Sequence, residues 1–155
     1  GLSLYIETKK HKILFDVGAS ELFLQNAKKL DVNVADVDFL VISHGHYDHG
    51  GGLKTFLKEN TKGEVFLHRL AFGQHYAIRP NDKLDFIGLD ENLKQNKQIV
   101  LTSDRFFINK GIQVFSNIVQ REPRPKSNSG LFTEHKGQMV DDTIAHEQNL
   151  AFRVA

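Results

Sequence analysis

The stretch VDFLVISHGHYDHGGGL, residues 37–53, joins an apolar run to a dense group of histidine and aspartate side chains. Its first part, VDFLVIS, is nearly continuous in apolar residues, which is typical of a short strand covered on both faces. Three histidines and an aspartate follow within positions 44–49, although the whole chain has only 8 histidines among 155 residues. The pattern therefore predicts a buried strand with a polar site at its carboxyl end.

The spacing within this cluster favours metal binding. In an extended segment, residues i and i+2 lie about 6–7 Å apart on the same side, so His44 and His46 can face one ion while Gly45 leaves room between them. Asp48 and His49 follow as the chain turns, and they can reach a neighbouring position. Histidine with carboxylate suits zinc, and also iron or manganese. The alternative, a polar loop whose histidines make caps and surface contacts, does not account for the H-x-H-x-D-H spacing.

Such a ligand set has a defined chemical use. Two ions about 3.5–4 Å apart can share a water molecule and lower its pKa towards 7. Asp48 would bind one ion and would also orient or deprotonate that water, which makes it the candidate catalytic residue. We therefore expect one or two metal ions, with zinc as the first choice.

Outward from the cluster, strands and helices alternate through the first half of the chain, which favours an α/β layered sandwich. Strands are expected at 2–8 and 12–18 (a hairpin with a charged turn), 37–43, 63–68, 81–88, 97–103, 104–111, 111–117 and from 146 onward. Helices are expected at 21–30, where Ser20 can act as the cap, at 50–60 and at 69–77. A loop is expected at 121–130, which is rich in proline and basic residues.

Composition narrows the possible partners and ligands. Hydrophobic residues make up 40% of the chain and charged residues 25%, as in an ordinary globular domain. The net charge of +1 gives no general reason to bind nucleic acid or an anionic membrane, and no apolar run is long enough to span a bilayer. Cysteine is absent, so a metal must be held by histidine, carboxylate and water. We expect a cytoplasmic protein that acts on a small molecule and has the potential to form a homo-oligomer.

The segment SHGHYDHGGG resembles the signature of the metallo-β-lactamase-fold superfamily, whose members are mostly dinuclear metallohydrolases. KILFDVGAS is similar to the strand and Asp-x-Gly turn that precede this signature in the family. VFLHRLAF and DDTIAHEQNLAF look most like the branch that includes the archaeal dihydropterin–ribofuranosylaminobenzene phosphate synthases and many uncharacterised hydrolases. The resemblance implies an αββα sandwich with the metals at one edge.

The resemblance also implies roles for individual residues. His44 and His46 would be two of the three histidines at the first metal, and Asp48 and His49 would belong to the second. Asp16 would lie beneath the site, where it hydrogen-bonds the ligand loop rather than a metal. The family's remaining ligands, a third histidine, a bridging carboxylate and a last histidine, follow later in the sequence.

In this branch a Gly-Cys-small-His segment supplies part of that set, and a chain without cysteine cannot contain the segment in its usual form. We therefore expect residues 1–155 to be a single domain that forms the N-terminal part of a larger catalytic domain. The sandwich would then be incomplete at its C-terminus, and this chain alone could be an inactive fragment.

For the other polar residues the sequence leaves more than one role open. His68 closes a strand and would be either a ligand or, more often in such positions, a residue that shapes the rim. His146 and Glu147 would make second-shell or substrate contacts, or cap the turn before the last strand. His75, His11 and His135 are expected at the surface. The basic residues of the 121–130 loop could reach a phosphate or carboxylate, although such loops are usually solvated; they are Arg121, Arg124 and Lys126.

Three functions remain open from the sequence. The first is a hydrolase that uses metal-activated water on an ester, lactone, amide or phosphoester. The second is a synthase-like metalloenzyme that acts on a phosphorylated pterin-type substrate. The third is a non-catalytic metal-binding module.

Overall fold

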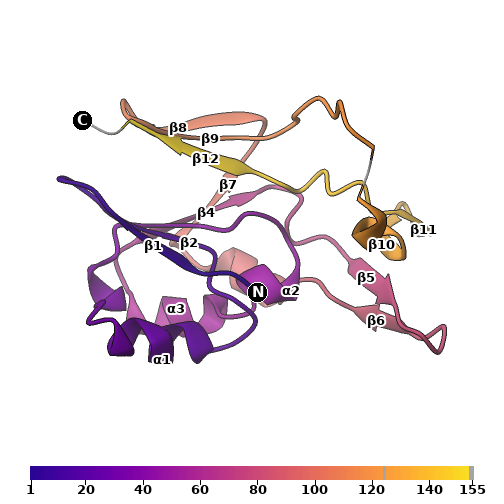
Figure 1. Ribbon diagram of the computed structural model, residues 1–155, viewed down its shortest axis with the longest axis horizontal. Helices are drawn as coiled ribbons and strands as arrows, with labels where there is room; N and C mark the ends of the chain where they lie inside the picture. Colours follow the sequence, from indigo (N-terminus) through magenta and orange to yellow (C-terminus); the bar gives the residue numbers. More distant parts are fainter. Residues whose placement is uncertain (124, 154–155) are drawn as a thin grey trace.

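The computed structural model describes residues 1–123 and 125–153. Its centre is a five-stranded sheet with the strand order β1-β2-β3-β4-β7 (Figure 1). The strands are β1 (Leu4–Glu7), β2 (Lys12–Phe15), β3 (Phe39–Val41), β4 (Glu64–His68) and β7 (Ile99–Thr102). β1 and β2 form the predicted antiparallel hairpin, while β2, β3, β4 and β7 run parallel to one another. The carboxyl ends of four neighbouring strands therefore meet at one edge of the sheet.

Helices cover one face of this sheet. The helices α1 (Leu22–Lys29) and α3 (Leu53–Glu59) lie side by side beneath it (Figure 1). Phe23 and Phe56 are the large buried side chains of these helices, and they belong to the same core cluster as Leu40 of β3. The cap of α1 differs slightly from the prediction: Glu21 occupies the N-cap position, and the Ser20 hydroxyl accepts a long, 3.4 Å hydrogen bond from Leu22.

A second sheet covers the other face. It has the order β12-β9-β8 and is formed by β8 (Arg105–Asn109), β9 (Ile112–Phe115) and β12 (Asn149–Phe152). Val41 and Phe66 of the first sheet pack against Val114 of the second. Because Leu40 faces the helices and Val41 faces the second sheet, β3 is covered on both faces, as the apolar run predicted. The expected layered α/β sandwich is confirmed.

A third sheet projects from the side of the sandwich, with the order β11-β10-β5-β6 (Figure 1). Its strands are β5 (His75–Ile78), β6 (Leu84–Phe86), β10 (Leu131–His135) and β11 (Gln138–Asp141). The predicted helix over 69–77 is wrong, because His75–Ile78 pairs on both sides, with β6 and with β10. The β10–β11 hairpin was not predicted, since its strands have little apolar alternation and β11 is exposed along its whole length.

Short elements connect these layers. The predicted helix over 50–60 is present as α3, and a further short helix, α2 (Tyr47–Gly50), lies within the histidine cluster just before it. The 3-10 turns η1 (Val34–Asp36), η2 (Glu91–Gln95) and η3 (Lys126–Asn128) lie in connections. Among residues 1–123 and 125–153, no helix has the length and apolar character that crossing a membrane requires.

Candidate metal centre

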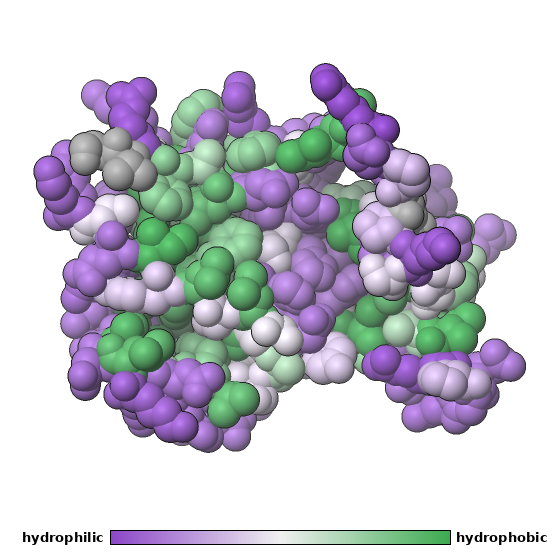
Figure 2. Space-filling model, viewed as in Figure 1, coloured by the Kyte–Doolittle hydropathy of each residue, from purple (hydrophilic) through white to green (hydrophobic). Residues whose placement is uncertain are grey.

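The predicted cluster lies at the edge where the parallel strands end. β2 runs directly into Asp16, and β3 leads within three residues to His44. In parallel sheets this edge is where binding sites form, because the loops that leave the carboxyl ends converge there. In the face seen in Figure 2, hydrophilic residues occupy the region of α2 and separate apolar patches on either side.

Gly45 is required by close packing rather than by its backbone angles. A Cβ atom at this position would collide with the backbone carbonyl of Ala71, in the turn after β4. The absence of a side chain therefore lets the histidine loop lie directly against the neighbouring connection. The ring centroids of His44 and His46, on either side of this glycine, are 4.7 Å apart.

Asp16 anchors the histidine loop from below. It is fully buried and has a positive φ of 62°, which aspartate tolerates better than most residues. Its Oδ1 accepts a 2.7 Å hydrogen bond from the backbone N–H of Ser43, and its Oδ2 accepts one of 2.8 Å from the Ser43 hydroxyl. The same Oδ2 lies 2.7 Å from Nδ1 of His49. Since a carboxylate can only accept, His49 carries a proton on Nδ1, and its Nε2 is directed elsewhere.

The Ser43 hydroxyl fixes the ring of His44 in the same way. Because the hydroxyl proton is donated to Asp16, Ser43 Oγ must accept from Nδ1 of His44, 2.9 Å away. The Nε2 atom of His44 is then unprotonated and available as a ligand. Burial, together with the nearby His49 and His46, lowers the pKa of His44 from 6.5 to about 3, so the ring is neutral at physiological pH.

A second carboxylate holds His46 from the opposite side. His46 is 6% exposed, and its Nε2 lies 3.1 Å from Oδ2 of Asp142, which is 1% exposed. The carboxylate again requires a proton on the facing nitrogen, so Nδ1 of His46 is left as the free ligand atom. Burial opposes ionisation of Asp142, but hydrogen bonds from His146 and His46 outweigh it and lower the pKa of Asp142 well below its usual range.

Three of the predicted ligands form one group. Each of His44, His46 and Asp48 offers a ligand atom within 4.8 Å of those of the other two. His49 joins this group through Asp48, whose Oδ2 lies 3.3 Å from His49 Nε2. The donor set of imidazole nitrogens and a carboxylate fits zinc, iron or manganese, and the hydrogen bonds described above leave one nitrogen of each histidine for an ion.

A second, fully buried group adjoins the first. It is formed by His46, His75, Asp142 and His146, whose ligand atoms also lie within 4.8 Å of one another. The prediction that His75 lies at the surface is wrong: the residue is 2% exposed, and its ring packs against that of His146 with centroids 3.9 Å apart and the planes tilted by 36°. The error follows from the missed strand, because pairing of β5 with β10 buries alternate side chains, and His75 is one of them.

Gln148 fastens the segment that carries Asp142 and His146. This side chain is 1% exposed, and its amide nitrogen donates to the backbone carbonyls of Ile42 and Phe66 at 2.9 and 2.8 Å. Its Oε1 accepts a 2.6 Å hydrogen bond from the hydroxyl of Thr102. Gln148 thus ties the start of β12 to the carboxyl ends of β3, β4 and β7.

The remaining candidates lie outside both groups. His68 is buried at the end of β4, where its Nδ1 accepts a 3.3 Å hydrogen bond from the backbone of Leu70. Burial, followed by the charge of Arg69, lowers the pKa of His68. His135 is exposed on β10, whereas His11 is half-buried against the ring of Phe39.

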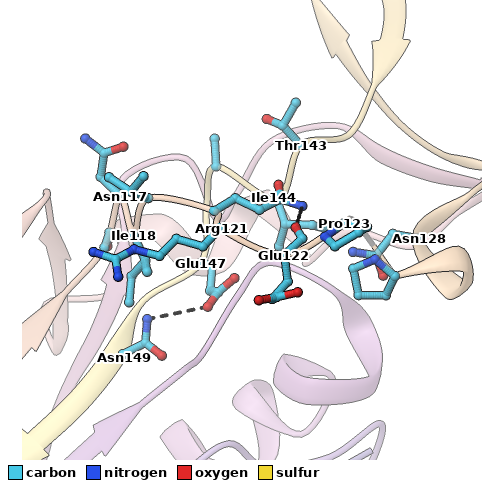
Figure 3. Close-up of a pocket in the computed structure, with 15 residues that line it drawn as sticks. Asn117, Ile118, Arg121, Glu122, Pro123, Asn128, Thr143, Ile144, Glu147 and Asn149 are labelled. Atoms are coloured by element: carbon cyan, nitrogen blue, oxygen red, sulfur yellow. Dashed lines mark hydrogen bonds between the residues drawn. The ribbon is translucent and has the colours of Figure 1, made fainter.

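Glu147 is exposed and lines a groove of about 1000 Å³ (Figure 3). There its carboxylate lies 3.4 Å from the side-chain amide of Asn149. Arg121 and Glu122 line the same groove, which therefore carries both signs of charge. Lys126 is exposed in η3, and Arg124 lies outside the described residues.

Sequence reasoning missed Asp142, His75 and Gln148. The segment His75–Ile78 has no alternation of polar and apolar residues, so no local pattern pointed to a strand that buries His75. Asp142 precedes His146 by four residues in the segment DDTIAHEQNLAF, but nothing in the local pattern shows that its carboxylate turns inward. A single glutamine before a strand gives no sign of burial.

The sequence of this chain resembles those of known proteins over most of its length. The sequence profile of the Metallo-beta-lactamase superfamily matches residues 1–102. Over 97% of its length the chain is 32% identical to the 7,8-dihydropterin-6-methyl-4-(β-D-ribofuranosyl)-aminobenzene-5'-phosphate synthase of Methanocaldococcus jannaschii, and it covers 56% of that protein. It is also 33% identical to an uncharacterized protein of the same organism, across 79% of this chain and 47% of that one.

Solved structures resemble the chain in fold. The crystal structure of Tm1679, a metal-dependent hydrolase of the β-lactamase superfamily, superposes with a TM-score of 0.72 at 29% identity, over 96% of this chain and 56% of that one. A quorum-quenching N-acyl homoserine lactone lactonase shares the fold, with a TM-score of 0.52 at 18% identity over 72% of this chain and 48% of that one. The chain spans about half the length of the curated relatives that it matches. On the strength of the profile match and the relative 32% identical to it, the chain belongs to the metallo-β-lactamase superfamily.

Proposed function

We propose that the protein is a metal-dependent hydrolase in which His44, His46, Asp48 and His49 hold one or two ions, with zinc as the preferred metal. The observation that carries the proposal is the orientation of the three histidines. Each has one ring nitrogen engaged by a serine or carboxylate, which leaves the other nitrogen to face an ion. His44 and His46 form one group with Asp48, and His49 Nε2 lies 3.3 Å from the Asp48 carboxylate. Hydrogen bonds of this kind fix the tautomer and orientation of metal-ligating histidines.

Bound divalent ions would supply Lewis acidity and lower the pKa of water towards 7. The side chain of Asp48 is 42% exposed, in contrast to the buried carboxylates Asp16 and Asp142. Asp48 is therefore the carboxylate that can reach both an ion and solvent, and we assign it the task of orienting a water molecule and accepting its proton. The candidate substrates are small molecules with an ester, lactone or phosphoester bond.

A second function is supported by the relative that is 32% identical to this chain, because that protein is a synthase named for a product with a 5'-phosphate. The same four residues would then form the metal site of a synthase-like enzyme that acts on a phosphorylated pterin-type substrate. A non-catalytic metal-binding module is the third candidate. It would use the same ligands and show no turnover.

These functions are separated by an activity panel. The purified chain, loaded in turn with Zn²⁺, Fe²⁺ or Mn²⁺, is assayed with chromogenic carboxylic esters, lactones and phosphomonoesters and phosphodiesters. The proposal predicts turnover of at least one class and a loss of at least tenfold in Asp48→Asn with metal retained. Asp90→Asn, an exposed aspartate that caps η2, is the control and should keep full activity. Metal binding without turnover of any class would refute the hydrolase and favour the synthase-like enzyme or the binding module.

A further inference from the structure

We propose that Asp142 is a positioning residue of this metal centre. It holds the ring of His46 so that Nδ1, and not Nε2, faces the ion. The inference rests on the proposed metal site and adds to it a residue that lies 93 positions or more from the ligand motif (His49 to Asp142). Asp142 would accept a hydrogen bond from His46 in the same way that Asp16 accepts one from His49. Two buried carboxylates would then orient two histidines from opposite sides of the loop.

The first step is the contact with His46. Both side chains are almost completely buried, and their facing atoms, Nε2 and Oδ2, are 3.1 Å apart. A buried carboxylate of this kind accepts a charge-assisted hydrogen bond, which holds the imidazole in one tautomer. The other Oδ atom of Asp142 accepts a 2.8 Å hydrogen bond from the backbone N–H of Ile144, which fixes the orientation of the carboxylate itself.

The second step excludes His146 as a ligand of the adjoining buried group. The backbone N–H of Gly45 donates to Nδ1 of His146 at 2.8 Å, so Nδ1 must be unprotonated. The neutral ring then carries its proton on Nε2, the atom that lies 3.2 Å from Oδ2 of Asp142. A nitrogen that carries a proton cannot bind a metal. His146 is therefore a second hydrogen-bond donor to Asp142, and it also links Asp142 to the backbone of the histidine loop.

The third step concerns His75, which completes the surroundings of Asp142. Its Nδ1 makes a long, 3.4 Å contact with Oδ2 of Asp142, and its Nε2 has no hydrogen-bond partner within the described residues. The ring packs against that of His146 and lies 5.6 Å, centroid to centroid, from His46. His75 thus helps to exclude water from the carboxylate, and the hydrogen bonds that Asp142 accepts from His46 and His146 are stronger in such surroundings.

The position of Asp142 is set by the backbone around it. Gln148 fastens the end of the segment to the carbonyls of Ile42 and Phe66, and the backbone N–H of Gln148 donates to the Ser43 carbonyl at 2.7 Å. At the other end, the N–H of Asp142 donates to the Leu131 carbonyl at 2.9 Å. The carboxylate is therefore held by the fold and does not depend on a bound ion for its place.

The test measures metal binding and the tautomer of His46 separately. Zn²⁺ affinity is obtained by competition with a chromogenic chelator, and Co²⁺ loading gives an absorption spectrum that reports ligand geometry. We expect Asp142→Asn to weaken Zn²⁺ binding 10- to 100-fold and to change the Co²⁺ spectrum, as loss of such an outer carboxylate does. Asp141→Asn, which removes the exposed neighbouring carboxylate, is the matched control and should match the wild type. In the metal-free wild type, nitrogen-detected NMR should show His46 protonated on Nε2.

Several results would overturn the inference. Wild-type affinity and an unchanged Co²⁺ spectrum in folded Asp142→Asn would do so, and so would a His46 ring protonated on Nδ1 in the metal-free chain. Loss of one equivalent of metal in His75→Phe would show instead that His75 and Asp142 are ligands. Absence of metal from the wild type would overturn the proposed function as well, whereas the other three results leave it standing.

Discussion

Replacement of Gln148 by leucine tests whether this side chain fastens the buried segment to the sheet. The substitution keeps the approximate volume and removes all polar atoms of the side chain. It removes the amide donors that lie 2.9 and 2.8 Å from the carbonyls of Ile42 and Phe66, and the acceptor 2.6 Å from the Thr102 hydroxyl. The Phe66 carbonyl keeps the backbone N–H of Ile42 as a donor, and the Thr102 hydroxyl keeps the Leu67 carbonyl as an acceptor. No water can reach these groups easily, because Gln148 is 1% exposed.

The expected loss follows from the three hydrogen bonds. A typical intramolecular hydrogen bond contributes about 1 kcal/mol, and a buried group left without a partner costs about 1–3 kcal/mol. The added apolar burial of leucine offsets part of this. We expect the free energy of unfolding to fall by about 3–4 kcal/mol. Because Gln148 also places Asp142, the affinity for Zn²⁺ should fall in the same variant.

Urea unfolding followed by circular dichroism measures the first effect. With a slope of roughly 2 kcal/mol per molar urea for a chain of this size, the midpoint should fall by about 1.5–2 M. Gln25→Leu, at an exposed position of α1, is the matched control and should change the free energy by less than about 0.5 kcal/mol. A midpoint in Gln148→Leu within 0.3 M (about 0.5 kcal/mol) of the wild type would refute the reasoning.

Three further predictions concern the loop, the backbone and pH. Gly45→Ala should destabilise the chain by about 1–3 kcal/mol and reduce metal content, because the new Cβ collides with the Ala71 carbonyl; thermal unfolding and elemental analysis measure both. Ile144→Asn should stabilise the metal-free chain by about 1 kcal/mol in thermal unfolding, since Ile144 has a φ of 57°, which asparagine adopts at lower cost. Burial lowers the pKa of His44 to about 3 and that of His146 to about 4. Between pH 6.5 and 4 the unfolded chain therefore binds protons that the folded chain does not, so stability should fall as pH falls, on the order of 3 kcal/mol for His146 alone. A flat urea midpoint across this range would contradict the last prediction.

The apolar run and the H-x-H-x-D-H spacing were enough to predict the buried strand and the clustering of histidines at its carboxyl end. The run at residues 37–43 is apolar on both sides of the strand because each side packs against a different layer. Leu40 packs in the core beneath the helices, and Val41 packs in the core beneath the second sheet. A strand of this kind ends at an edge of the sheet, so residues that follow it directly belong to the site. The local sequence thus carried most of the information about the first half of the chain.

The second half could not be predicted in the same way, because its structure depends on distant partners. His75 lies in a segment that would suit a helix until β10, more than 50 residues later, pairs with it. Asp142 and Gln148 are polar residues near a turn, and their buried partners include residues far away in the sequence, His46 for Asp142 and the carbonyls of Ile42 and Phe66 for Gln148. Contacts across about 100 residues leave no periodicity in the sequence.

The central claim, that His44, His46, Asp48 and His49 hold metal, is tested most directly by elemental analysis of the chain purified without chelator. The account predicts one to two equivalents of zinc, iron or manganese per wild-type chain, and less than a tenth of that in the double variant His44→Ala/His46→Ala. His135→Ala, at an exposed position of β10, serves as the control and should keep the wild-type content. Equal metal content in the wild type and the double variant, or no metal in either, would contradict the claim.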